Sequence, residues 1–427
     1  MDAAIKDLMC FLDDAPTAWH AVKYVSDKLK QSGFNELVET ESWKLQPGER
    51  YFVTRNDSSL CAFVTPEKEM TKAHIIASHT DSPGFKLKPN PAFLKENMIL
   101  LGVEMYGAPL IASWLNRDLG VAGRVTYLDA DNKLQRSLIR LDSHPLVIPQ
   151  LAIHLDRQVN ENGVTLNKQE QLAALAGLTD DSELQSDYLE KLLQKKLPLQ
   201  KLLSHDLFLF PLEKAALLGD RGQMIAAYRI DSLCSVHAAM EAIRQIKIPS
   251  SDTLQMMTIW DNEEIGSMTA QGAGSPFQAH VLERITLANQ TPRAEYLRLL
   301  RNSLCLSVDL THALHPNYSD KHEPRHPILM QHGVVIKYSA QHRYASDADS
   351  GGIIAAICHK NGIPLQRFVS RGDIPSGSTI GPIQAHTIGM PCVDIGCAQL
   401  SMHSCRELTA CQDHIYMSTL LKAFFAH

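Results

Sequence analysis

In the stretch LQMMTIWDNEEIG, residues 254–266, an apolar run is followed by four polar residues, an isoleucine and a glycine. The apolar part ends at Trp260, and its length and composition predict a buried β-strand. Two adjacent carboxylates, Glu263 and Glu264, follow it. They could form a solvent-exposed turn. Alternatively, they could lie beside a cation at the end of the strand, because neighbouring like charges are otherwise unfavourable there.

Strand-like and helix-like stretches alternate throughout the sequence after residue 225. The strand-like runs are LQMMTIW, LCLSV, GVVIKY, LQRFVS and PCVDIG, and the helix-like stretches include SVHAAMEAIRQI, GGIIAAICHK and IYMSTLLKAFF. This alternation predicts an α/β sheet covered by helices. Residues 91–225 differ, with glycine-punctuated segments followed by a polar, helix-prone stretch at 168–203. We therefore expect one α/β domain formed by residues 1–90 and 226–427, with a β-containing module at 91–225 inserted into it.

The composition excludes several classes of protein. A net charge of −6 and a pI near 6.3 predict that nucleic acid is not the partner. The nine cysteines form no CxxC pair, which indicates reduced thiols. No apolar run reaches the length of about 18 residues that a membrane span needs. The N-terminal sequence MDAAIKDLMCFLDDAPTAW lacks the pattern of a signal peptide, so we expect a cytoplasmic protein.

Histidines and carboxylates follow five of the predicted strands. The five groups are His79 with Asp81, Asp231, Glu263 with Glu264, Asp309, and His403 beyond PCVDIG. Taken singly, each has an ordinary explanation, since an aspartate after a strand often caps a helix and most of the 19 histidines cannot be ligands. Taken together, two histidines and several carboxylates without a thiolate suit zinc, manganese or cobalt.

The number of candidate ligands favours two metal ions. One catalytic zinc needs about three protein ligands, whereas two ions about 3.5–4 Å apart use five if one carboxylate bridges them. Side chains of an extended segment alternate in direction. One of Glu263 and Glu264 would therefore bind metal, while the other takes the proton from the metal-bound water. Asp81 would orient the imidazole of His79.

The chain resembles the aspartyl aminopeptidases, which are dinuclear zinc aminopeptidases. The matching segments run from about residue 15 to the C-terminus and include SHTDSPGFKLKPNP, LAIHLDRQVNENG, YRIDSLCS, WDNEEIGSMTAQGA, SVDLTHALHPNY, GVVIKYSAQHRYASD and LSMHSCRE. The resemblance implies a zinc-aminopeptidase type of α/β fold, in which helices flank a mixed sheet and a β-containing dimerisation domain is inserted.

The resemblance also implies a role for each candidate residue. Two Zn²⁺ ions per subunit would be bridged by Asp231, with His79 and Asp309 completing one site and Glu264 and His403 completing the other. Glu263 would be the general base acting on the water that bridges the metals. The inserted domain would form dimers that build a dodecamer, and it would place His154 of one subunit in the active site of the other, to stabilise the oxyanion.

A preference for peptides with N-terminal Asp or Glu requires a cationic pocket, because an unpaired buried carboxylate is costly. Lys337 and Tyr344 match the family's pocket residues, although without the resemblance Lys337 reads as a solvated lysine at a strand end. Beside it, SAQHRY departs from the family's usual NANQRY. The sequence thus predicts a metallo-aminopeptidase, with Mn²⁺ or Co²⁺ as possible substitutes for zinc. The alternatives are an aminopeptidase of broad or neutral specificity, a dizinc deacylase, and a catalytically silent oligomeric shell.

Overall fold

The computed structural model describes residues 2–179 and 187–427, which form two compact units. The first unit comprises Met1–Asp81, Ala215–Met402 and Glu407–His427, and the second comprises Ser82–Lys214 and His403–Arg406. The inserted unit thus starts and ends earlier than the expected 91–225. It starts earlier because β5 (Gly84–Lys95) pairs with β6 (Met98–Tyr106), and it ends earlier because β12 (Met224–Ala227) pairs with β20 (Glu407–Ala410) of the first unit.

In the described part of the first unit, nine strands form a sheet in the order β1-β2-β3-β13-β4-β14-β18-β16-β17. Their bounds are β1 Asn35–Leu37, β2 Arg50–Arg55, β3 Ser59–Val64, β4 Lys72–His79, β13 Thr253–Trp260, β14 Leu304–Val308, β16 Val334–Lys337, β17 Leu365–Phe368 and β18 Cys392–Gly396. The three central neighbours β13, β4 and β14 run parallel, whereas β3 and β16 run antiparallel to β13 and β18. The predicted mixed sheet is confirmed.

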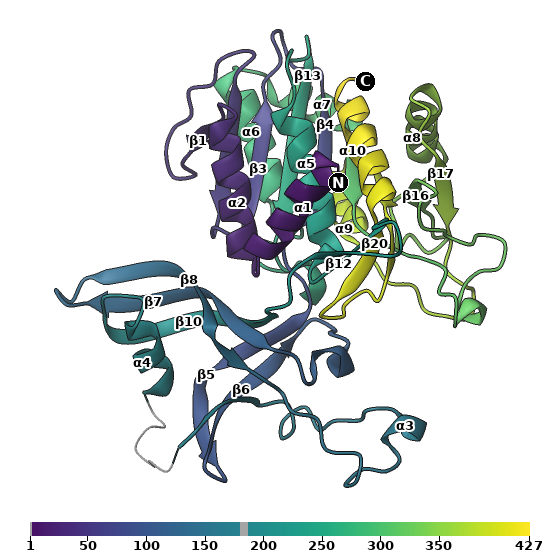
Figure 1. Ribbon diagram of the computed structural model, residues 1–427. Helices are drawn as coiled ribbons and strands as arrows, with labels where there is room; N and C mark the ends of the chain where they lie inside the picture. Colours follow the sequence, from purple (N-terminus) through teal and green to yellow (C-terminus); the bar gives the residue numbers. More distant parts are fainter. Residues whose placement is uncertain (1, 180–186) are drawn as a thin grey trace. The chain divides into compact units, whose positions relative to one another are not determined.

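Helices cover both faces of this sheet (Figure 1). On one face lie α1 (Ala3–Asp14), α2 (Ala18–Gln31), α5 (Ile230–Arg244), α8 (Ala348–Lys360) and α10 (Cys411–Phe425); on the other lie α6 (Phe277–Ala288), α7 (Arg293–Asn302) and α9 (Ile380–Ile388). Along β13 the side chains alternate between the two cores, with Met257 and Ile259 in one and Met256 and Trp260 in the other. Burial on both faces explains why the strands read as continuous apolar runs.

A smaller sheet in the first unit has the order β11-β12-β20-β19-β15 over the described residues. Its further strands are β11 Ala216–Leu218, β15 Thr311–His312 and β19 Ala398–Leu400. β15 and β19 pair in parallel, and β15 begins two residues after Asp309. The chain therefore passes from β14 of the large sheet into β15 of the smaller sheet through Asp309 and one further residue.

The described residues of the second unit contain a sheet of order β8-β7-β10-β5-β6-β9. Its further elements are β7 Leu119–Asp129, β8 Leu134–Leu146, β9 Ala174–Leu178, β10 Leu199–Pro211, α3 Val159–Asn162 and α4 Tyr188–Gln194, with a 3-10 helix at Ile111–Trp114. The stretch 168–203, which is helix-prone in sequence, holds β9, α4 and the start of β10, while its residues 180–186 lie outside the described part. Pairing of β9 with β6 overrides the local helical preference.

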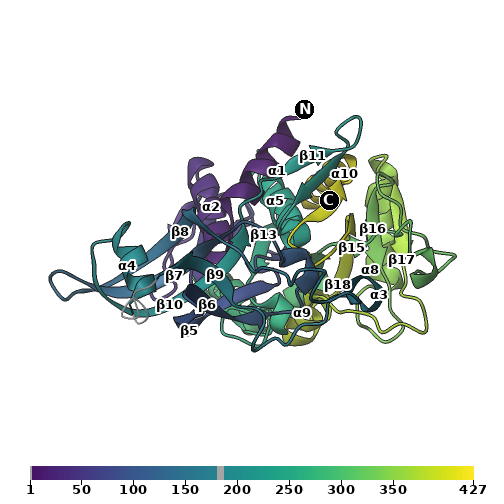
Figure 2. The ribbon, with the colours of Figure 1, turned by 60° about the horizontal axis from the view of Figure 1, so that its bottom comes forward.

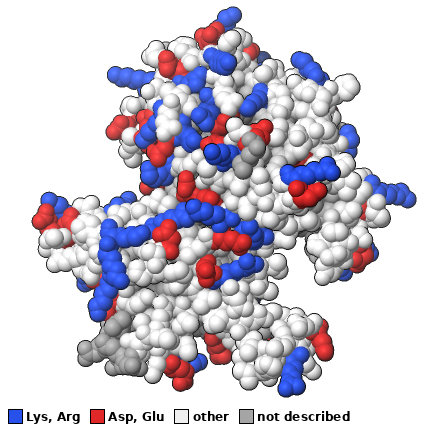
Figure 3. All heavy atoms as spheres, in the orientation of Figure 1, with Lys and Arg blue, Asp and Glu red and all other residues white. Residues whose placement is uncertain are grey.

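On the face of the first unit that Figure 3 shows, basic and acidic side chains are interspersed, in keeping with 41 Lys and Arg against 47 Asp and Glu in the sequence. Among the helices of residues 2–179 and 187–427, none combines the length and the apolar character needed to cross a bilayer.

Candidate active site

Three parallel strands bring candidate residues to one edge of the large sheet. His79 is the last residue of β4 and lies opposite Trp260, the last residue of β13. Glu263 and Glu264 follow β13, and Asp309 follows β14 on the other side of β4. Because carboxyl ends of neighbouring parallel strands meet at the same edge, these side chains lie near one another.

Asp231, at the start of α5, completes a cluster around His79. The Nε2 atom of His79 lies 3.2 Å from Oδ1 of Asp231 and 3.5 Å from Oδ1 of Asp309. Potential ligand atoms of His79, Asp231 and Glu264 all lie within 4.8 Å of one another. An imidazole with several carboxylates is a donor set that zinc and manganese accept. The residues in this cluster are therefore chemically suited to hold a metal ion.

Glu263 and Glu264 lie in a short 3-10 helix, Glu263–Ile265, so the extended conformation expected for them is wrong. Asn262 begins the turn with a left-handed φ of 64°. Its side-chain oxygen accepts hydrogen bonds from Thr269 and Gln271, at 2.8 and 2.9 Å. The side chains of Glu263 and Glu264 therefore point in different directions because of the helical turn, and not because side chains alternate along a strand.

Asp81 forms hydrogen bonds with both the turn Glu263–Ile265 and His79. Its two carboxylate oxygens accept the backbone N–H groups of Glu263 and Glu264, each at 3.1 Å. The Nδ1 atom of His79 lies 3.1 Å from the backbone oxygen of Asp81 and 3.5 Å from its carboxylate. The expected contact with the imidazole is therefore made at closer range by the carbonyl, while the carboxylate connects the ends of β4 and β13.

Lys337 is buried at the end of β16, with 3% of its surface exposed, so it is not the solvated lysine that the sequence alone suggested. Its Nζ atom donates to Oδ2 of Asp309 at 3.1 Å and lies 5.6 Å from the centre of the Tyr344 ring. Tyr344 is also buried, and its hydroxyl accepts a hydrogen bond from Ser376. A single cation thus contacts both the cluster and the tyrosine.

The crowding of carboxylates shifts several pKa values. Burial raises the pKa of Glu263 to about 8, and it raises the pKa of Glu264 well above its usual value, with repulsion from Asp231 adding to the effect. Burial opposes protonation of His79, but hydrogen bonds to Asp231 and Asp309 raise its pKa well above the ordinary value. For Asp309, burial is outweighed by Lys337 and His79, which hold its pKa well below the usual range.

Three further buried charged residues support the cluster and were not singled out from the sequence. Glu407 accepts the backbone N–H of Asp231 at 2.9 Å. Arg229, with a left-handed φ of 65°, donates to the carbonyl oxygens of Ala15 and Thr80. Asp261 follows β13 directly, and burial raises its pKa to about 7. In the sequence, these three residues are marked only by being charged residues near a predicted strand or a candidate ligand.

His403 and His154 lie in the second unit. His403 has a left-handed φ of 66°, and its Nδ1 atom lies 3.2 Å from the carbonyl oxygen of Ala108. His154 is exposed in a turn. The structure thus brings together His79, Asp231, Glu264 and Asp309, and it groups these two histidines with the inserted unit.

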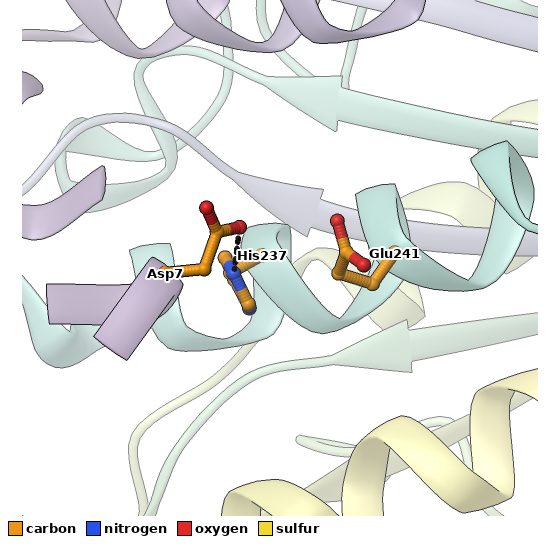
Figure 4. A group of neighbouring side chains, drawn as sticks. All are labelled: Asp7, His237 and Glu241. Carbon is orange, nitrogen blue, oxygen red and sulfur yellow. Dashed lines mark hydrogen bonds and ion pairs between the residues drawn. The ribbon is translucent and has the colours of Figure 1, made fainter. Parts of the chain in front are cut away.

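A second histidine–carboxylate group, Asp7, His237 and Glu241, lies between α1 and α5 (Figure 4). His237 Nε2 lies 3.1 Å from Asp7, and Lys28 forms an ion pair with the same carboxylate at 3.2 Å. The hydrogen bond with His237 is the main reason why the pKa of Asp7 lies well below its usual range. Glu241 is paired with Arg244. Because basic side chains balance both acids, we interpret this group as an ion-pair network.

Comparison with known proteins identifies the chain's relatives. The profile of the family described as Aminopeptidase I zinc metalloprotease (M18) matches residues 11–425. The chain belongs to this family. It is similar to the probable M18 family aminopeptidase 2 of Clostridium novyi, with 39% identity over 426 residues that cover 98% of each chain.

Solved M18 structures show the same fold. The mApe1 of Chaetomium thermophilum is 30% identical with a TM-score of 0.88, over 98% of this chain and 96% of that one. The mApe1 dodecamer of S. cerevisiae is 27% identical with a TM-score of 0.85, over 100% and 97%.

Membership of M18 makes the chain a metallo-aminopeptidase, which is a hydrolase, in a family of zinc metalloproteases. The resemblance to aspartyl aminopeptidases is confirmed at the level of this family.

Proposed function

We propose that this M18 aminopeptidase removes N-terminal Asp and Glu residues from peptides, with two zinc ions in each subunit. The observation that carries the proposal is the contact between the cluster around His79 and a buried cation, Lys337, through Asp309. A cluster of this kind suits a catalytic metal centre, and the adjacent ammonium group suits an acidic side chain of the first residue.

Five residues would hold the metal ions. His79 and Asp309 would bind one ion, Glu264 and His403 the other, and Asp231 would bridge them. Metal ions held by these residues would supply Lewis-acid chemistry, lowering the pKa of a bound water and polarising the scissile carbonyl. Manganese or cobalt could replace zinc, because these ions accept the same ligands.

Glu263 would be the general base. Its carboxyl group has a pKa raised to about 8 by burial, and bound cations would lower that value towards neutrality. A carboxyl group in this range can take a proton from the attacking water and deliver it to the leaving amine. Asp81 would keep Glu263 in place through the hydrogen bond to its backbone N–H.

The main alternative is an aminopeptidase of broad or neutral specificity, and one observation favours it. Lys337 already pairs with Asp309, so part of its charge is compensated before a substrate arrives. A substrate carboxylate would have to share this cation. Measured specificity therefore decides between the two proposals.

The test is hydrolysis of Asp-, Glu-, Ala-, Leu- and Lys-anilides with and without a chelator, by the wild type, Lys337→Met and the exposed-site control Lys360→Met. We expect chelator-sensitive cleavage led by Asp and Glu. Lys337→Met should lose this preference, whereas Lys360→Met should retain it. Chelator-sensitive cleavage led by Leu or Ala in the wild type would replace the acidic specificity with the neutral alternative.

We also propose that the inserted unit mediates self-association into dimers that build a dodecamer. A similar structure, S. cerevisiae mApe1, is described as a dodecamer. His154, which is exposed in the inserted unit, would stabilise the oxyanion in the active site of the neighbouring subunit. Mixing His154→Phe with a metal-site variant should then restore part of the activity. Absence of restoration after confirmed subunit exchange would contradict this arrangement.

A further inference from the structure

A cavity of about 480 Å³ lies in the first unit, at the amino ends of β4 and β13. Its walls come from the starts of these two strands, the end of α5 with the loop that follows it, and the last residues of α10. In both Figure 1 and Figure 2 the end of α10, marked C, lies beside α5 and β13. The volume falls in the range of sites that bind small molecules, about 300–1,000 Å³.

The cavity is separate from the candidate active site. His74 of β4 lines the cavity, whereas His79 ends the same strand in the metal-binding cluster. At about 3.3 Å per residue of strand, the two histidines lie roughly 17 Å apart along β4. In the same way α5 runs from Asp231 in the cluster to Ala242 in the wall of the cavity. None of the five proposed metal ligands lines the cavity.

The charged side chains in the wall of the cavity are basic. Lys247, in the loop after α5, and Lys422, near the end of α10, are exposed, and neither forms an ion pair with a residue that the structure describes. None of the described Asp and Glu residues lines the cavity, although the chain has a net charge of −6. Asp252 lies outside the wall and accepts a hydrogen bond from the Thr71 hydroxyl at 2.9 Å. Two lysines without a carboxylate partner favour an anionic ligand, which could form charge-assisted hydrogen bonds with both.

His74 adds a buried acceptor to this wall. It is 5% exposed, and its Nδ1 atom donates to the carbonyl oxygen of Phe424 at 3.1 Å, which leaves Nε2 for a ligand. Its ring stacks on that of Phe424, with the centroids 4.7 Å apart, and lies 6.2 Å from the ring of His427. Burial, together with the charges of Lys72 and His427, lowers the pKa of His74 to about 4. Near neutral pH Nε2 is therefore an unprotonated acceptor, and it suits a ligand that carries a hydroxyl group.

Apolar side chains supply the rest of the surface that the argument needs. Ile246 and Phe425 lie in the wall, and so does Ile248, which is 80% exposed. A ligand with a flat ring would cover this apolar surface. An anionic group, a hydroxyl group and a flat ring occur together in a nucleotide, whereas an amino acid or a short aliphatic acid lacks at least one of them.

We propose that this cavity binds a nucleoside monophosphate or a similar sugar phosphate, with Lys247 and Lys422 contacting the phosphate and Nε2 of His74 accepting a sugar hydroxyl. The apolar wall would contact the base. The proposal goes beyond the proposed function and does not depend on it, because the cavity and the metal cluster share no residue.

The experiment is isothermal titration calorimetry of the zinc-loaded, full-length protein in a phosphate-free buffer. We expect AMP to bind once per chain and adenosine to bind at least about tenfold more weakly, because adenosine lacks the charge-assisted hydrogen bonds. The double variant Lys247→Gln/Lys422→Gln should bind AMP about 100-fold more weakly, at about tenfold per lysine. The matched control Lys44→Gln/Lys360→Gln makes the same change of charge at two exposed lysines outside the cavity, and it should bind AMP as the wild type does.

Ribose 5-phosphate separates the two sources of the phosphate. If it binds as tightly as AMP, and if the double lysine variant weakens both, the ligand is a sugar phosphate and the base makes no contact. Failure of both AMP and ribose 5-phosphate to bind would overturn the proposal, as would equal binding of AMP and adenosine. AMP held by zinc in the active site would bind to the double lysine variant with wild-type affinity, and that result would overturn the proposal as well. Because both lysines are exposed, we expect the variant to fold, which its thermal unfolding without ligand checks.

Discussion

The hydrogen bonds of Asp81 allow a quantitative prediction for Asp81→Asn. The two carboxylate oxygens accept the N–H groups of Glu263 and Glu264, both at 3.1 Å, and Asp81 is 4% exposed. Asparagine keeps one acceptor and turns an NH₂ group towards the other N–H. One charge-assisted bond is lost, which costs about 2 kcal/mol. If this cost falls on the turn that carries Glu264, a proposed metal ligand, zinc affinity should fall roughly 30-fold, within the range found for residues that support ligands.

The assay is zinc titration of the metal-free protein in competition with a fluorescent chelator. Asp129→Asn is the matched control, since Asp129 also accepts two backbone N–H groups, from Asp131 and Lys133, but in a surface turn of the second unit. We expect this control to bind zinc as the wild type does. If Asp81→Asn also binds zinc with wild-type affinity, the turn does not depend on these bonds, and the reasoning is refuted.

Three further predictions concern catalysis, the loop of Tyr344 and pH. Glu263→Gln should keep its zinc, measured by atomic absorption, but lose turnover by about 10²–10⁴-fold because the proposed general base is removed; loss of zinc instead would make Glu263 a ligand. Asp394 accepts hydrogen bonds from Thr379 and from the N–H next to Tyr344, both at 2.6 Å. Asp394→Asn should therefore raise KM more than it lowers kcat, and the reverse pattern in steady-state kinetics would count against this role. Burial lowers the pKa of His74 from 6.5 to about 4, so between these values the unfolded chain binds more protons and stability falls as the pH falls. In His74→Gln, the loss of folding stability between pH 6.5 and 4 should be smaller by roughly 3 kcal/mol. An unchanged pH profile of thermal unfolding would contradict the assignment of this loss to His74.

The strands that form the candidate site were predictable because their signal is local. LQMMTIW corresponds to β13 and LCLSV to β14, since both strands are buried on two faces and so appear as continuous apolar runs. Parallel order then places the residues after these strands at one edge. That step needs no knowledge of distant contacts.

The geometry of the turn after β13 was not predictable, because its causes are distant in the sequence. The 3-10 conformation of Glu263–Ile265 depends on a left-handed Asn262 and on the carboxylate of Asp81, which is 182 residues away from Glu263. Similarly, Glu407 contacts the backbone of Asp231 across 176 residues. No local pattern marks such partners, so a conformation set by them becomes visible only in the fold.

The pKa shifts in the cluster share one cause, which bears on how a cation would bind. Glu263 and Glu264 resist ionisation because they are buried among other carboxylates, and His79 is held protonated by the same neighbours. A metal ion requires a neutral imidazole and ionised carboxylates, so it must displace these protons. Lys337 already lowers the pKa of Asp309 well below its usual range, which favours the ionised form of that proposed ligand before a metal ion binds. Metal affinity should therefore increase with pH through protons released by His79 and the glutamates, while Asp309 contributes none.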